Sequence, residues 1–192
     1  MTTPGLLVTH GLDVRLEMLG AYSAGLPPLY RRFGGYYLAI GGPGRGCEAL
    51  GTSPPASGKV AVFGNLQAIR DFWWCEEYRS LVPLRAAGGR FDSFATEAVA
   101  ATWPVPGPHI YVAYATRAEA LELERVRGAG AAVLVDSTAF DRLEGDPPWQ
   151  RIAVWSASPE SRTAVDVASG DLARADLHVY RIQPAAAGEP SR

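Results

Sequence analysis

The side chains able to do chemistry gather in the first hundred residues. The run DFWWCEEYRSLVPLR, residues 71–85, holds two tryptophans, a tyrosine, a thiol and paired carboxylates. A carboxyl group buried beside an aromatic ring has a raised pKa and can act as an acid. Glu77 is therefore a candidate catalytic acid, and a solvated pair with Glu76 is the alternative interpretation.

His10 is the second candidate for proton transfer. It ends the first apolar segment, GLLVTHG, which the β-branched content predicts to be a strand. Imidazole titrates near neutral pH, so His10 could be a general base or could hydrogen-bond a ligand. The alternative is a histidine whose ring bonds backbone at a strand end. No two histidines have helical i, i+4 spacing and none has an acid at ligand spacing, so we predict no metal site.

Phenols and arginines on the preceding elements could bind or ionise a substrate. Tyr22 is a third catalytic candidate, and Arg32 could hold a carboxylate or a phenolate. The candidate substrate-binding side chains are Tyr30, Arg32, Tyr37, Trp73, Trp74 and Tyr78.

The aromatic run also has a purely structural interpretation. On a 3.6-residue period, Trp74 and Tyr78 are neighbours on one helical face, while Ile69 and Trp73 share another. One face must pack on the helix's own sheet, and the other could meet a partner subunit or line a cavity. Aromatic stripes are more often core than ligand contacts, so packing is the simpler alternative.

Composition excludes several classes of protein. The 192 residues carry a formal net charge of −2, and Lys59 is the only lysine among 18 basic residues, so we expect no nucleic-acid partner. Two cysteines are too few for a disulfide framework. We see no signal peptide and no apolar run long enough to span a bilayer, which predicts a cytoplasmic protein without a membrane partner.

The order of predicted elements indicates an α+β fold. In residues 1–100 we expect strands at 6–10, 36–40, 59–63 and 90–98. Asp13 is a candidate cap for a helix that Pro27-Pro28 should interrupt, and Asn65 a cap for a helix from Leu66 to about Tyr78. This β-α-β-β-α-β order is that of a ferredoxin-like fold.

A second copy of the pattern follows a linker. Three prolines in residues 101–108 predict that linker, and residues 109–184 again offer strands, at 109–115, 131–136, 151–157 and 177–182. Helices are expected at 118–126 and from Pro159. CEALGTSPPASGKVAVFGN (47–65) aligns with FDRLEGDPPWQRIAVWSAS (140–158), which indicates an internal repeat. Residues 185–192 read as a disordered tail.

The first repeat resembles the bacterial family of unknown function numbered 1330, a branch of the dimeric α+β barrel superfamily. The resemblance rests on FGGYYLAIGG (33–42), KVAVF (59–63) and FWWCEEYRSLVPLR (72–85), and more weakly on LEGD (143–146) with RIAVW and SPE in the second repeat. The second repeat lacks the aromatic helix and has TAVDVASGDLA (163–173) in its place.

The resemblance implies an architecture and a range of activities. Superfamily members pair two four-stranded sheets into a barrel, so a tandem repeat could form an intramolecular pseudo-dimer, and a further homodimer stays open. Relatives include cofactor-independent isomerases, cyclases and oxygenases that bind aromatic or polyketide-like metabolites between sheet and helices. We expect such an enzyme, without a cofactor and with one pocket in the first repeat. The alternatives are a non-catalytic small-molecule binder and a structural interaction protein.

Overall fold

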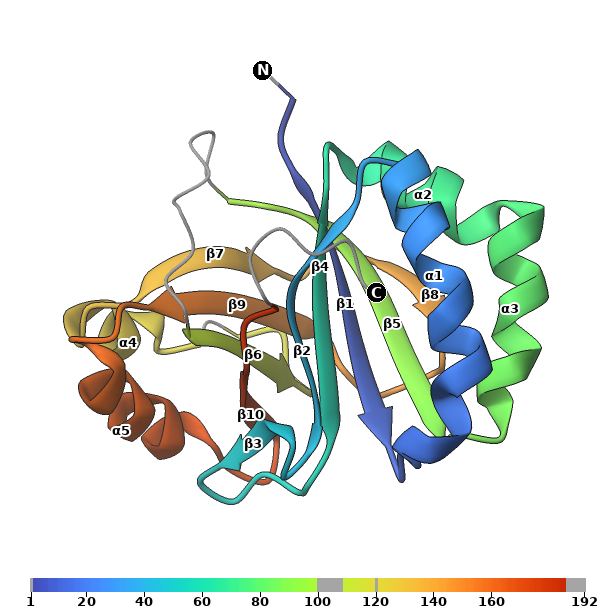
Figure 1. Cartoon of the computed structure of the whole chain (residues 1–192). Helices are drawn as coiled ribbons and strands as arrows, with labels where there is room; N and C mark the ends of the chain where they lie inside the picture. Colours follow the sequence, from blue (N-terminus) through green and yellow to red (C-terminus); the bar gives the residue numbers. More distant parts are fainter. Residues whose placement is uncertain (1, 100–108, 120, 186–192) are drawn as a thin grey trace.

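The computed structural model describes residues 2–99, 109–119 and 121–185. Within them, ten strands form one curled sheet and five α-helices lie on its outside (Figure 1). The strands are β1 Gly5–Leu12, β2 Tyr36–Pro43, β3 Gly46–Leu50, β4 Ser57–Phe63, β5 Arg90–Glu97, β6 His109–Ala115, β7 Ala132–Ser137, β8 Asp141–Glu144, β9 Arg151–Ala157 and β10 Leu177–Ile182. The helices are α1 Gly20–Arg32, α2 Leu66–Trp74, α3 Glu76–Ala86, α4 Leu123–Gly128 and α5 Arg162–Leu172, with a 3₁₀ turn at Leu16–Leu19.

The two halves of the chain have the same strand order. The first half runs β2-β4-β1-β5 across the sheet and the second runs β7-β9-β6-β10, with antiparallel neighbours throughout. This is the ferredoxin-like order that the β-α-β-β-α-β pattern predicted. Both repeats therefore adopt the expected fold.

Two short strands join the repeats and were not predicted. Strand β3 of the first repeat pairs with β10 of the second, and β8 of the second repeat pairs with β5 of the first. Each repeat thus adds one short strand alongside the last strand of the other repeat. The sheet is curled, and a hydrogen bond of 2.9 Å from the Val99 amide, just after β5, to the Leu134 carbonyl of β7 links two of its distant parts.

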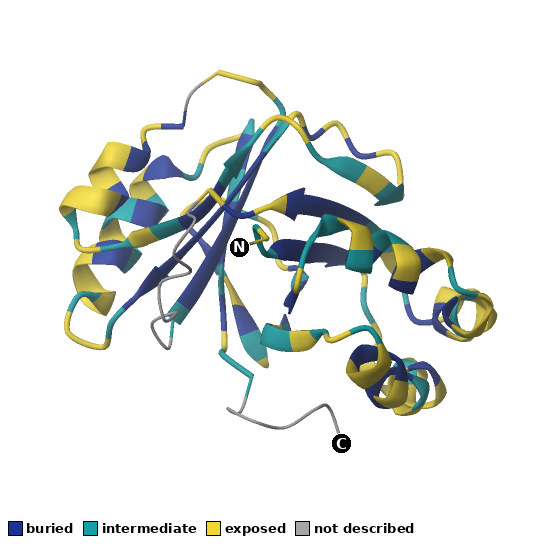
Figure 2. Cartoon of the chain, turned by 90° about the horizontal axis from the view of Figure 1, so that it is seen from above, coloured by how far each residue is buried: buried dark blue, intermediate teal, exposed yellow. Residues whose placement is uncertain are grey.

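Side-chain alternation along the strands produces two kinds of core. Leu6 and Val8 of β1 point into the barrel, where they pack with residues of the second repeat such as Val112 and Val154. Leu7 points outward against α1 and α2. The strands are buried along most of their length and the helices expose their outer faces (Figure 2). One apolar layer therefore lies inside the barrel, and one lies under each set of helices.

The helical layer of the first repeat differs from its prediction in three ways. Asp13 has a positive φ of 55° and binds Arg90, so it caps no helix. Pro27 and Pro28 lie inside α1 and do not interrupt it. The predicted helix from Leu66 to Tyr78 is capped by Asn65 as expected but breaks at Cys75, whose extended ψ of 149° starts α3 in a new direction.

The remaining differences are local. The strand expected at 36–40 is longer than predicted, because β2 continues to Pro43 and the turn that follows is made by Gly44 and Arg45. Gly41 is required there, since a Cβ would lie 2.1 Å from the carbonyl carbon of Gly46. In the second repeat α4 is one short turn, Leu123–Gly128, and α5 starts at Arg162 instead of Pro159. The predicted linker 101–108 and the tail beyond residue 185 lie outside the described residues.

Candidate active site

A cavity of about 310 Å³ lies between the sheet and α1 in the first repeat. We call it the sheet–helix pocket. Its apolar wall comes from the 3₁₀ turn, α1 and β2, and includes Leu16, Leu19, Leu26 and Ile40. Seven side chains supply its polar groups and come from β1, α1, β2, β4 and α3: Thr9, Tyr22, Ser23, Tyr37, Ser57, Lys59 and Arg85. A mostly apolar cavity with a few convergent polar groups is the usual form of a small-molecule site.

Lys59 is the one lysine of the chain and lies half-buried in this pocket. Among the described residues its ammonium group forms no salt bridge and no hydrogen bond, and the nearest ring is Tyr37, with its centroid 6.0 Å from Nζ. Burial lowers the pKa of Lys59, and Arg85 lowers it further, while Tyr22 and Glu144 raise it. A lysine in this setting can act as a base or a nucleophile at lower pH than an exposed one.

The two phenols of Tyr22 and Tyr78 meet behind the pocket wall. Their hydroxyl oxygens lie 3.2 Å apart, and both side chains are buried. Burial raises the pKa of Tyr78, and the neighbouring Tyr22 adds to the shift. Tyr78 is therefore a neutral hydroxyl at physiological pH, and a phenol group can both donate and accept hydrogen bonds.

Arg85 brings a buried positive charge to the same pocket. Its side chain is 2% exposed, its guanidinium lies over the rings of Tyr22 and Trp73 at 5.3 and 5.6 Å, and it binds the carboxylate of Glu144. Glu144 belongs to β8 of the second repeat and does not line the pocket, so the second repeat reaches the site through this ion pair. In the sequence, Arg85 and Glu144 drew attention only as parts of the segments FWWCEEYRSLVPLR and LEGD, and neither residue was assigned a role.

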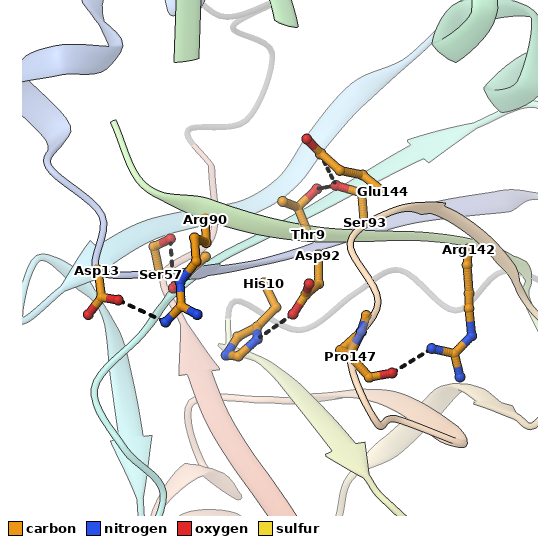
Figure 3. A network of polar contacts seen from close by, with 11 residues as sticks. Thr9, His10, Asp13, Ser57, Arg90, Asp92, Ser93, Arg142, Glu144 and Pro147 are labelled. Atoms are coloured by element: carbon orange, nitrogen blue, oxygen red, sulfur yellow. Dashed lines mark hydrogen bonds and ion pairs between the residues drawn. The ribbon is translucent and has the colours of Figure 1, made fainter. Parts of the chain in front are cut away.

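A series of hydrogen-bonded side chains leads from the pocket toward solvent. Thr9 and Ser93 face each other across β1 and β5, and their hydroxyl oxygens lie 3.3 Å apart (Figure 3). Ser93 in turn donates to Glu144 at 3.5 Å. Glu144 is 29% exposed and lines a second, outer cavity of about 620 Å³, which shares Arg85 and Phe91 with the sheet–helix pocket. Protons can therefore pass between the pocket and solvent along hydroxyls.

His10 lies on the opposite face of the sheet from the other catalytic candidates. Thr9 points toward the helices, so its neighbour His10 points into the barrel, where its ring packs on Tyr114 at 4.8 Å and Tyr180 at 5.4 Å. Its Nδ1 lies 3.7 Å from a carboxylate oxygen of Asp92 (Figure 3). The expectation that His10 faces a site between sheet and helices is wrong, because a one-residue step along a strand changes the face.

The other candidates divide between surface and core. Glu77 and Arg32 form an ion pair with each other and are 53% and 58% exposed. A hydrogen bond to the backbone lowers the pKa of Glu77, and Arg32 lowers it further, which is opposite to the shift a buried acid would have. Trp74 is 61% exposed, whereas Tyr30 and Trp73 lie in the aromatic core beneath the helices. Of the nine candidates, Tyr22 and Tyr37 line the sheet–helix pocket.

A larger groove of about 750 Å³ follows β3 and β10 and offers weaker chemistry. Its arginine, Arg181, already binds Asp166 and Glu48, and Arg162 also pairs with Asp166. These charges compensate one another, so the groove presents no group comparable to Lys59.

The described residues contain no cluster of three or more His, Cys, Asp or Glu side chains arranged to hold a metal ion. None of their helices has the length and apolarity needed to cross a bilayer.

Solved structures with the same fold cover almost the whole chain. An anthrone oxidase-like protein superimposes with a TM-score of 0.56 and 10% identity, covering 98% of this chain and 95% of that one. A monooxygenase candidate from Fusobacterium nucleatum has a TM-score of 0.47 and 9% identity, covering 95% and 93%, and one from Lactobacillus acidophilus has 0.46 and 10%, covering 95% and 94%. The last two structures superimpose only loosely on this chain.

The fold and the first of these structures define the class: this chain has the dimeric α+β barrel fold, with both halves of the barrel in one polypeptide. No family model and no curated sequence matches the chain. The finer resemblance to the family numbered 1330 accordingly remains a sequence-based expectation.

Proposed function

We propose that this chain is a cofactor-independent oxygenase that acts on an aromatic, polyketide-like metabolite in the sheet–helix pocket. Lys59 carries the proposal: it is a lysine without a carboxylate partner among the described residues, and it opens into an apolar cavity. The fold shared with an anthrone oxidase-like protein agrees with this proposal and suggests a phenolic ring system with an activated methylene as the substrate.

In the first step, the neutral amine of Lys59 takes a proton from the activated C–H or phenolic O–H group of the substrate. The ammonium formed, together with the buried guanidinium of Arg85, stabilises the substrate anion in a cavity whose wall is mostly apolar. The hydroxyls of Thr9 and Ser93 lead from this point to Glu144, which can pass the proton to solvent.

In the second step, the electron-rich anion reduces O₂. For a methylene substrate the sum is R₂CH₂ + O₂ → R₂C=O + H₂O, in which one oxygen atom enters the product and the other leaves as water. The electrons come from the substrate, so the reaction needs no further redox group. An isomerase or cyclase would use the same proton abstraction without O₂, and consumption of O₂ separates the possibilities.

The test is O₂ uptake by the purified protein with a panel of anthrones and dihydroxynaphthalenes. Lys59→Met and Lys59→Arg should each lower turnover about 100-fold or more, because general-base catalysis contributes ~10²–10⁴. Arg31→Met, on the exposed surface, is the matched control, and Glu77→Gln tests the acid that the sequence suggested. Turnover unaffected by either Lys59 variant would refute the proposal. Tryptophan quenching without O₂ uptake would instead favour a binding protein.

A further inference from the structure

We propose that Lys59 also forms imines with aldehydes that fit the sheet–helix pocket, which makes the pocket a covalent carbonyl-binding site. This goes beyond the proposed oxygenase, in which the amine acts only as a base. The ligand class is an aromatic aldehyde, because the cavity offers an apolar wall, which includes Leu19 and Leu26, to an aromatic ring and the amine of Lys59 to the carbonyl group.

The first argument is the state of the amine. A lysine paired with a carboxylate stays protonated and cannot attack a carbonyl carbon. Lys59 has no salt bridge or hydrogen bond among the described residues, and burial lowers its pKa, so its neutral form is more abundant than that of an exposed lysine. The buried cation of Arg85 acts in the same direction.

The second argument is the supply of proton donors and acceptors. The Nζ lone pair attacks the carbonyl carbon, a C–N bond forms, and the π electrons move to oxygen, which takes a proton to give a carbinolamine. The hydroxyl group then takes a second proton and leaves as water, and the C=N bond forms; the amine nitrogen gives up its two N–H protons in these steps, which balances the two protons that leave with the oxygen. Tyr22 and Thr9 line the pocket and carry hydroxyls that can relay both protons.

The third argument is protection of the product. Imines in water hydrolyse readily, so a lasting adduct needs a site from which water is excluded. Leu16, Leu19 and Leu26 form an apolar wall of the cavity. The carboxylate of Glu144 already raises the pKa of Lys59 through its charge, and it would stabilise a protonated imine in the same way.

The experiment is borohydride trapping with 2-naphthaldehyde, followed by peptide mapping. The Arg31→Lys variant of the full chain places an exposed lysine beside Lys59 in the same sample. Cleavage after arginine gives residues 46–70 with Lys59, residues 16–32 with position 31, and residues 1–15 with the α-amine, so each amine is read separately.

We expect the peptide 46–70 to be reduced and labelled several times more than the peptide 16–32 at pH 7.5. A phenolic ligand that fills the pocket should suppress only the first label. Equal or weaker labelling of the peptide 46–70 would overturn the inference. Because O₂ uptake by phenolic substrates is measured separately, failure of the imine leaves the oxygenase proposal standing, and loss of O₂ uptake leaves the imine result intact.

Discussion

The guanidinium of Arg85 binds the carboxylate of Glu144, although the two residues are 59 positions apart and belong to different repeats. Arg85 ends the aromatic helical layer of the first repeat, and Glu144 ends the strand β8 that the second repeat adds to the edge of the first sheet. The ion pair therefore links the helical layer of the first repeat to the edge strand that the second repeat adds. Neither described helix of the second repeat, α4 or α5, carries an aromatic residue, yet β8 of this repeat supplies the carboxylate that pairs with Arg85.

Breaking this ion pair should destabilise the fold. Removing one partner of a buried pair leaves an uncompensated charge and costs ~3–5 kcal/mol, and since Glu144 is 29% exposed we expect about 2–3 kcal/mol for Glu144→Ala. Urea denaturation measures the change. The exposed neighbour Asp146→Ala is the control and should change stability by less than about 0.5 kcal/mol. A loss below 1 kcal/mol at position 144 would mean that solvent compensates Arg85 instead.

The two adjacent tryptophans should differ sharply when each is replaced by alanine. Trp73 is fully buried against Tyr78 and Arg85, so Trp73→Ala should cost about 3–5 kcal/mol of unfolding free energy. Trp74 is 61% exposed and contacts the guanidinium of Arg79 at 5.3 Å, which limits the loss to about 1 kcal/mol. Chemical denaturation of both variants provides the comparison. Similar losses would show that Trp74 packs against a second subunit.

The break at Cys75 gives a third prediction. The Cys75 thiol accepts a hydrogen bond from the Tyr78 amide at 3.4 Å and so caps α3. Serine is a better cap than cysteine, whereas alanine offers no acceptor, so Cys75→Ser should stabilise the fold or leave it unchanged and Cys75→Ala should cost ~0.5–2 kcal/mol. Thermal unfolding of the two variants tests this order. A more stable alanine variant would show that the residues continue as one helix.

The sequence predicted the elements whose signals are local. Strands β6 and β9 have the bounds expected from HIYVAYA and RIAVWSA, because runs of β-branched and aromatic residues mark buried strands wherever they occur. Strands β3 and β8 were missed because each pairs only with the other repeat, and nothing in GCEAL or DRLE announces a distant partner. The break at Cys75 was missed because helical periodicity continues through it.

The site was harder to predict, because the chemistry of a charged side chain depends on whether the fold places an opposite charge beside it. Glu77 and Arg32 looked reactive alone, but the fold pairs them on the surface, where their charges cancel. In the sequence, Lys59 was assigned no role, although a lysine at the start of the apolar strand KVAVF was a usable signal. The role proposed for Lys59 depends on its having no carboxylate partner among the described residues, and only the tertiary structure reveals this.

Lys59 should make the stability of the protein depend on pH. Its pKa is lowered in the folded chain, while in the unfolded chain it is about 10.4, so the unfolded state binds more protons between these values and stability rises with pH up to the unfolded pKa. Lys59→Met removes this cost of burying a charge and should raise Tm at pH 7, by about 2–4 °C for each kcal/mol recovered. The gain should shrink as pH approaches 10, since the wild-type amine then loses its charge in both states. Differential scanning calorimetry at pH 6, 8 and 10 measures the difference in Tm between wild type and Lys59→Met, and Arg31→Met controls for the loss of a surface charge. A difference in Tm that stays constant with pH would mean that Lys59 keeps its charge in the folded protein through solvent or a partner. The base proposed for catalysis would then have to be another group.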